Sequence, residues 1–209
     1  MCCPSLCPRP EPMNQSGFLD RDEIAALGFA EVGARVQIDR SARFYGAERI
    51  RIGSDVRIDA YSVLSAGADG ISIGKHVHLA VYVFLTGRAR IELRDFCGLS
   101  GRVSVYSSND DYLGDALTGP TIPEELRKVT HAPVIVGRHV VVGAGSVILP
   151  GVTIGEGACV GALSLVKQDV PEFTIVAGQK LHVIGPRRTQ FLELEPRLRA
   201  MEADKGSSR

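Results

Sequence analysis

The segment VGRHVVVGAGSVILPGVTIGEGACVGALSLV, residues 136–166, repeats with a period of six. Each sixth residue is apolar, and a small or β-branched residue follows it four positions later. Six fits neither the 3.6 residues of a helical turn nor the two-residue period of a strand, so the segment is an internal repeat. The rhythm predicts a triangular parallel β-solenoid in which each hexad forms one short side. The expected inward residues are Val136, Val142, Ile148, Ile154, Val160 and Val166.

The same rhythm recurs upstream with interruptions. Coils are expected to start at residues 32, 52, 73 and 93, which are 20, 21 and 20 residues apart rather than the 18 of three hexads. Each early coil therefore carries two or three extra residues at a corner. From Leu93 to Val136 the gap is 43 residues, which predicts an extended loop at 106–132. The expected inward residues of these coils are Val32, Ile38, Phe44, Ile52, Ile58, Leu64, Ile73, Leu79, Leu85, Leu93, Leu99 and Val105.

The segments outside the repeat predict its two ends. Residues 1–15 are rich in proline and cysteine, and we expect a disordered tail. Residues 16–31 contain Asp20 before a short apolar face and Gly28 after it, which predicts a helical cap over the first coil. The β-helix itself is expected to span 32–172. Residues 173–209 are charged with weak helical periodicity, so they are interpreted as a C-terminal extension with a helix.

Composition excludes several classes of function. The chain has 209 residues, a formal net charge of zero and no long basic run, which argues against a nucleic-acid partner. No apolar stretch approaches membrane-spanning length, so no membrane span is expected. Cys97 and Cys159 fall within hexads and are predicted to be buried free thiols. Free thiols favour a reducing compartment, and we expect a cytoplasmic protein.

At Gly143-Ala144-Gly145-Ser146-Val147-Ile148-Leu149-Pro150-Gly151 and the hexads after it, the chain resembles the hexapeptide-repeat acyltransferases. The resemblance is strongest to the maltose, galactoside and xenobiotic O-acetyltransferase branch and covers about residues 32–185. It implies a left-handed parallel β-helix, so the expected fold is all-β with the short terminal helices predicted above. It also implies a homotrimer with acetyl-CoA sites in the clefts between subunits, and no resident metal.

The resemblance also implies where the co-substrate lies. In the family, backbone amides at glycine and alanine corners bind the pantetheine arm, and basic groups near the end of the last coil hold the 3′-phosphate. The glycines have an alternative explanation, because glycine permits a tight corner. The basic positions are shifted from the family pattern, and surface solvation explains each one equally well. The matching residues are Gly143, Ala144, Gly161, Ala162, Lys167, Lys180 and Arg187.

The general base is where the chain departs from the family. The long loop of the maltose and galactoside enzymes opens with a histidine base, whereas that position falls here on Asp110. A carboxylate is a weaker base than imidazole and suits a sugar hydroxyl poorly. Turn chemistry is an equally good reading of the Asn109-Asp110-Asp111 run. The candidates for catalysis are Asp110, His78 and His131, and those for acceptor binding are Asp111, His76 and Tyr82.

Three further readings follow. An amino-sugar acceptor needs less help from a base than a hydroxyl does, so N-acylation of a nucleotide-linked sugar competes with O-acetylation in surface-polysaccharide synthesis. A γ-class carbonic anhydrase shares the solenoid but needs three histidines around zinc. Its His-x4-His pair is absent, since the histidines here fall at His76, His78, His131, His139 and His182. A non-catalytic β-helix protein is the remaining alternative.

Overall fold

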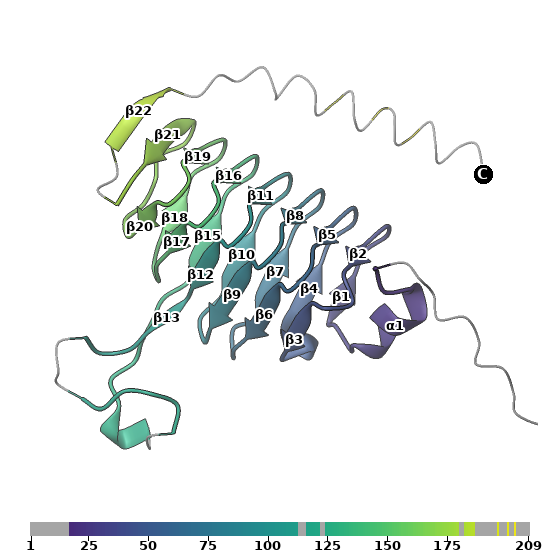
Figure 1. Cartoon of the computed structure of the whole chain (residues 1–209), viewed down its shortest axis with the longest axis horizontal. Coiled ribbons are helices and arrows are strands. Elements are labelled where there is room, and N and C mark those ends of the chain that lie inside the picture. The colour runs from purple at the N-terminus through teal and green to yellow at the C-terminus, as the bar shows by residue number, and fades with distance from the viewer. Residues whose placement is uncertain are drawn as a thin grey trace, which may run out of the picture.

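In the computed structural model, residues 17–112, 116–121, 124–179 and 182–186 are described, with the single positions 196, 200 and 203. The chain forms a left-handed parallel β-helix whose coils stack along the long axis of the molecule (Figure 1). The all-β fold predicted from the hexads is therefore confirmed. The expected tail at 1–15 and most of the expected C-terminal helix lie outside the described residues.

Three parallel sheets form the sides of the triangle, and each takes one strand from every complete coil. Sheet I contains β1 (Glu31–Val32), β4 (Ile50–Ile52), β7 (Ile71–Ile73), β10 (Ile91–Leu93), β15 (Val134–Val136) and β18 (Thr153–Ile154). Sheet II contains β2 (Gln37–Ile38), β5 (Arg57–Ile58), β8 (His78–Leu79), β11 (Gly98–Leu99), β16 (Val141–Val142), β19 (Cys159–Val160), β21 (Thr174–Ala177) and β22 (His182–Pro186). Sheet III contains β3 (Arg43–Tyr45), β6 (Val63–Ala66), β9 (Phe84–Gly87), β12 (Ser104–Tyr106), β17 (Val147–Ile148) and β20 (Leu165–Val166).

The strand register follows the hexads. Leu93 pairs with Val136 across the 43-residue gap, and Val136 pairs with Ile154 one regular coil later. Most of the expected inward residues are buried, from Ile38 and Ile58 to Ile148 and Val166, each at 0% exposure. Val32 is the exception, at 38% exposure, and Phe44 is only partly buried. Both belong to the first coil, which has a neighbouring coil on one side alone.

The N-terminal helix α1 (Arg21–Ala26) forms where the sequence predicts it. Asp20 caps the helix by accepting from the backbone N–H of Glu23, and the Glu23 carboxylate accepts from the backbone N–H of Asp20. Arg40 of the first coil clamps the same Glu23 carboxylate with two hydrogen bonds, at 2.5 and 2.8 Å. This capping box and its arginine tie the helix to the open end of the solenoid. A short 3₁₀ turn, η1 (Ala47–Arg49), fills one corner of the first coil.

The other end differs from the sequence prediction. Residues after 172 first continue the solenoid, because β21 pairs in parallel with β19, and β22 then turns back antiparallel along β21. Cys159 also differs, since it is partly exposed in β19 whereas Cys97 is buried. Burial raises the pKa of the Cys97 thiol to about 12, so this thiol stays protonated at neutral pH.

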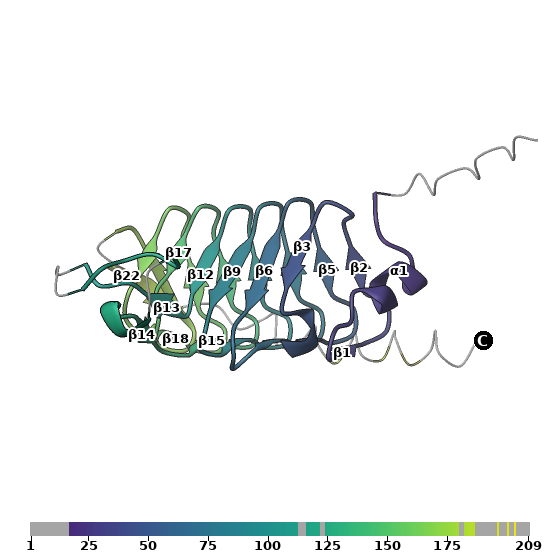
Figure 2. The same cartoon turned by 90° about the horizontal axis from the view of Figure 1, so that it is seen from below.

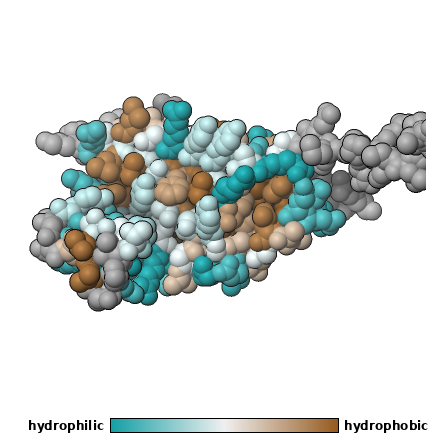
Figure 3. Space-filling view, turned by 60° about the horizontal axis from the view of Figure 1, so that its bottom comes forward, coloured by the Kyte–Doolittle hydropathy of each residue, from teal (hydrophilic) through white to brown (hydrophobic). Residues whose placement is uncertain are grey.

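The loop between β12 and β15 projects from one side of the solenoid (Figures 1 and 2). Its base is a two-stranded antiparallel ribbon, β13 (Ser108–Asn109) with β14 (Thr130–His131). Between these strands lies the 3₁₀ turn η2 (Glu124–Leu126). In the space-filling view the loop forms a separate lobe whose surface mixes hydrophilic and hydrophobic residues (Figure 3). The insertion predicted from the 43-residue gap therefore carries side chains well away from the coils.

Candidate active site

The outer face of sheet II carries one of the predicted catalytic residues in a charged cluster. His78 in β8 is about half exposed, and its Nε2 lies 2.8 Å from an Asp59 carboxylate oxygen. Arg57 donates to the other oxygen of Asp59 at 2.7 Å. Burial raises the pKa of Asp59, but the hydrogen bonds from His78 and Arg57 outweigh it and hold that pKa below its usual range. Asp59 is therefore ionised at neutral pH and fixes the His78 ring.

Two predicted acceptor-binding residues, His76 and Tyr82, occupy corners of the solenoid. Both have positive φ, 56° and 61°, a backbone conformation that the corners impose coil after coil. The His76 ring stacks on Phe96 with centroids 4.7 Å apart, and its side chain is only 17% exposed. This packing gives His76 a structural role in the corner. Tyr82 is about half exposed and stacks on Tyr61 at 5.1 Å, so it remains accessible to a ligand.

The other three candidates lie on the loop. Asp110 is exposed and follows β13 directly, and Asp111 accepts a hydrogen bond from the backbone N–H of Ala116 at 3.0 Å. His131 in β14 is exposed, and its Nδ1 lies 2.7 Å from the Ser108 hydroxyl. Because β13 and β14 pair in register, Asp110 and His131 share the base of the loop. Asp111 has a role in the turn, whereas Asp110 and His131 face solvent.

The predicted co-substrate residues lie at the edge of sheet II. The backbone N–H groups of Gly143 and Gly161 donate to the carbonyls of Val160 and Val176, each at 2.7 Å. Those two amides are already used in the ladder, so a pantetheine arm would need other donors at these corners. Ala144 and Ala162 beside them are exposed, as is Lys167. Lys180 and Arg187 lie outside the described residues.

Sequence reasoning missed Ser100 on the same face. The register Leu99–Val142–Val160 places Ser100, Gly143 and Gly161 at equivalent positions in three successive coils. Ser100 therefore presents a partly exposed hydroxyl one coil before Gly143 and Gly161, which together form a glycine column. Aligning the coils rather than the inward residues alone would have found it, because a hydroxyl replaces glycine there.

The sheet II group and the loop group lie at different corners. Ser100 precedes β12, a strand of sheet III, and Asp110 follows it, so one side of the triangle separates them. Five extended residues span on the order of 15 Å. The fold of the chain therefore does not bring Ser100 and His78 together with Asp110 and His131.

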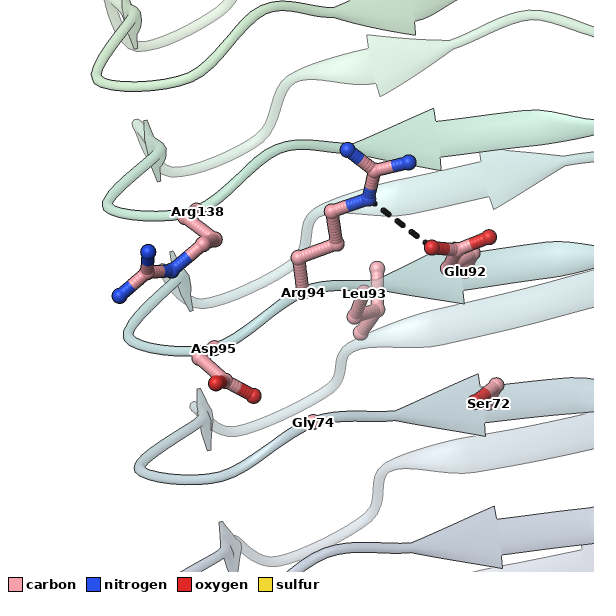
Figure 4. A pocket seen from close by; sticks show the side chains of 7 residues that line it. All are labelled: Ser72, Gly74, Glu92, Leu93, Arg94, Asp95 and Arg138. Carbon is pink, nitrogen blue, oxygen red and sulfur yellow. Dashed lines mark hydrogen bonds and ion pairs between the residues drawn. The ribbon is translucent and has the colours of Figure 1, made fainter.

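A hollow of about 300 Å³ on the outer face of sheet I contains none of the predicted residues. Figure 4 shows Arg94 reaching back to Glu92, with Asp95 and Arg138 nearer the corner. Glu92 accepts from Arg94 at 2.9 Å and lies 3.1 Å from Arg90. The acidic and basic side chains of this hollow therefore neutralise one another. Among the described residues there is no group of three His, Cys, Asp or Glu side chains that could hold a metal ion, and no helix long and apolar enough to cross a membrane.

Comparison with known proteins supports a single family. Residues 133–168 match the model described as bacterial transferase hexapeptide (six repeats). The chain is 42% identical over 178 residues to the dTDP-4-amino-4,6-dideoxy-D-glucose acyltransferase of Escherichia coli, covering 85% of this chain and 93% of that protein. The chain belongs to the hexapeptide-repeat acyltransferases. This chain is also 28% identical to the putative lipopolysaccharide biosynthesis O-acetyl transferase WbbJ of Escherichia coli K12, over 71% of this chain and 74% of WbbJ.

Solved structures of a relative carry ligands. This chain superposes with a TM-score of 0.85 on AntD, an N-acyltransferase from Bacillus cereus, in complex with dTDP and 3-hydroxybutyryl-CoA. The two are 39% identical, and the match covers 89% of this chain and 98% of AntD. An AntD variant in which a serine is replaced by cysteine binds dTDP-4-amino-4,6-dideoxyglucose and coenzyme A. Its TM-score against this chain is again 0.85, at 38% identity, and the match covers 90% of this chain and 99% of the variant.

Proposed function

We propose that this protein transfers an acyl group from a coenzyme A thioester to the amino group of a dTDP-linked amino sugar. The match to the Escherichia coli dTDP-amino-sugar acyltransferase, at 42% identity over nearly the whole of both chains, carries the proposal. The AntD complexes with dTDP-4-amino-4,6-dideoxyglucose and with an acyl-CoA support both substrates. Of the two acceptor chemistries that the sequence left open, these relatives support the amine.

Ser100 and Asp110 are the residues we assign to the chemistry. The AntD structures include mutants at a serine and at an aspartate ten positions further along the chain. In this chain Ser100 and Asp110 are the one serine and aspartate with that spacing. Asp110 was also the position predicted from the family histidine. Both are partly or fully exposed, as substrate-contacting groups must be.

The reaction needs few groups from the protein. The neutral amine attacks the thioester carbonyl, the C–N bond forms, the C–S bond breaks, and coenzyme A leaves as the thiol. The Asp110 carboxylate holds the arriving ammonium and takes a proton from the nitrogen, and the thiolate is reprotonated as it leaves. We assign the Ser100 hydroxyl as the donor to the thioester oxygen, on which negative charge develops.

The separation of Ser100 from Asp110 within one chain favours an assembly of subunits, which we propose to be a homotrimer. A site that uses both residues has to be completed by a second subunit, whose loop supplies Asp110. The sequence resemblance implies the same assembly. Size-exclusion chromatography with light scattering at micromolar concentration should give three times the chain mass of 22.4 kDa. A monomeric mass would contradict both the trimer and the shared site.

The test of the function is a thiol-release assay with purified protein. Acetyl-CoA and 3-hydroxybutyryl-CoA are compared as donors, and dTDP-4-amino-4,6-dideoxyglucose is compared with its 4-hydroxy analogue. We expect turnover that requires the amine, and the N-acyl product should appear by mass spectrometry. The preferred donor sets the acyl chain length. Absence of thiol release with every donor would overturn the proposal, and turnover of the hydroxyl analogue alone would restore O-acetylation.

The co-substrate wall is tested at Ala162. This exposed residue lies beside Gly161 at the corner between sheets II and III and does not point into the core. An indole at this position would obstruct a pantetheine arm on the wall. We expect the Ala162→Trp variant to bind coenzyme A at least about tenfold more weakly, roughly 1.4 kcal/mol, with an unchanged thermal midpoint. Calorimetric titration measures the affinity, and an unaltered dissociation constant places the arm elsewhere.

The cellular role follows from the product. An N-acylated dTDP-sugar is an activated glycosyl donor, and nucleotide sugars of this kind are consumed in building surface polysaccharides such as lipopolysaccharide. WbbJ, a relative at 28% identity, is named for lipopolysaccharide biosynthesis. Cys97 and Cys159 are free thiols, which favour a reducing compartment, and we assign the enzyme to the cytoplasm on that ground.

A further inference from the structure

A basic pocket of about 450 Å³ lies between the loop and the solenoid. It is lined by Arg88, Glu124, Arg127, Val129 and His131. Arg88 stands on the corner after β9, and the other four belong to the loop at and before β14. The pocket contains two permanent positive charges and one negative charge.

Arg127 carries a donor without an acceptor. Its Nε is buried, and among the described residues it has no hydrogen-bond partner. A buried N–H of a guanidinium group is costly to leave unsatisfied, because charged donors lose the most when they are desolvated. A guanidinium presents its donors as a planar fork that matches two oxygens of a phosphate or carboxylate group. An anionic ligand in this pocket could therefore accept the hydrogen bond that Arg127 Nε does not make within the described residues.

Two other basic residues line the pocket. The His131 ring is held in place, and the Arg88 side chain is easily released from its ion pair. The Ser108 hydroxyl accepts from the backbone N–H of Arg88 at 2.7 Å and contacts His131 Nδ1 at 2.7 Å. This fixes the imidazole and leaves its Nε2 for a ligand. The Arg88 side chain meets Glu124 at 3.4 Å, with exposed fractions of 59% and 82%. An ion pair this exposed is weak, so an anionic ligand can replace Glu124 at little cost.

We propose that this pocket binds the diphosphate group of the acceptor nucleotide, an inference that rests on the function proposed above. Coenzyme A also contains a diphosphate, but there the pantetheine arm separates it from the reacting thioester. In a nucleotide sugar the diphosphate is bonded to the sugar ring that carries the amine. Ser108 lies two residues before Asp110, so a diphosphate in this pocket places the attached sugar beside the proposed base.

The test compares affinities of the full-length protein for dTDP, dTMP and coenzyme A by calorimetric titration. Wild type should bind dTDP more tightly than dTMP. Arg127→Gln and Arg88→Gln should each weaken dTDP binding at least tenfold and leave coenzyme A within about twofold. Arg127→Lys keeps the charge but lacks Nε, and it should lose most of the same affinity. Lys128→Gln is the matched control, because it removes a neighbouring charge that does not line the pocket, and dTDP affinity should stay within twofold.

Every other result overturns the proposal. Loss of coenzyme A binding with intact dTDP binding would assign the pocket to the acyl donor. Unchanged binding of both ligands in folded Arg127 and Arg88 variants would mean that the pocket holds neither diphosphate, and a wild type that binds no dTDP would exclude the nucleotide. Turnover separates a failure of this inference from a failure of the proposed function. If the wild type turns over the dTDP-amino sugar and the Arg127 variants bind dTDP as tightly as the wild type does, only the assignment of this pocket is overturned.

Discussion

We expect the Asp110→Asn variant to fold and assemble like the wild type and to lose turnover by about 10²- to 10⁴-fold. Asp110 is exposed on the loop, so the change does not touch the core. An amide keeps the size of the side chain but can neither take a proton from the attacking amine nor hold an ammonium as a charge partner. Steady-state kinetics with the dTDP-amino sugar measure kcat and KM separately. A fall confined to kcat indicates lost proton transfer, and a rise in KM alone indicates lost binding of the ammonium.

Asp111→Asn is the matched control for this variant. The Asp111 carboxylate accepts from the backbone N–H of Ala116, and an amide oxygen can accept the same bond. Its turnover should therefore stay close to that of the wild type. His78→Asn and His131→Asn test the other two candidates, and each should lose less than Asp110→Asn does. Wild-type turnover in Asp110→Asn, or an equal loss in Asp111→Asn, would remove Asp110 from the chemistry.

The Gly143→Ala substitution should destabilise the protein by about 1–3 kcal/mol, because the corner is overpacked by one methyl group. A Cβ at this position would overlap the backbone nitrogen of Ala162 in the next coil. Backbone atoms in a stacked coil cannot rotate away as a flexible side chain does, so the coils must separate. Urea unfolding followed by circular dichroism measures the loss as a lower midpoint with an unchanged slope.

Gly98→Ala is the control at a comparable place in sheet II. A Cβ on Gly98 has no described atom within 4 Å, and its backbone lies in β11 with ordinary strand geometry. Alanine there should leave the midpoint unchanged or raise it slightly, because it reduces the freedom of the unfolded chain. Equal midpoints for the two variants would show that Gly143 is not constrained by packing. In that case a contact with the co-substrate would again be the better explanation of this glycine.

These two substitutions separate the two explanations that the sequence left open for the glycine column. Gly143 and Gly161 were expected to donate backbone N–H groups to the co-substrate, yet both donate to the carbonyls of the next coil. A parallel solenoid needs those hydrogen bonds in every coil, since no other partner is available to the buried backbone. The residues that remain exposed beside these glycines are Ala144 and Ala162.

The sequence by itself determined the coils. A six-residue period predicts a triangular solenoid whose sixth-position side chains point inward, so residues from Ile38 to Val166 could be placed in the core from the sequence alone. The irregular spacings located the corner insertions and the long loop, because extra residues cannot enter a side without breaking the register. The helix at Arg21–Ala26 followed from the Asp20 cap. At the first coil the pattern failed for Val32, since periodicity does not say whether a coil has neighbours on both sides.

Only the tertiary structure decided which polar residues meet. His78 and Asp59 are 19 residues apart and become partners because their coils stack, and His131 meets Ser108 because the loop folds back on itself. The hexad rule carries no information about outward side chains, whose positions depend on corner insertions and on the path of the loop. The separation of Ser100 from Asp110 across sheet III and the buried Arg127 Nε are properties of that packing. For this reason the fold was predictable from local periodicity, whereas the contacts of the candidate site residues depend on how the coils stack and how the loop folds.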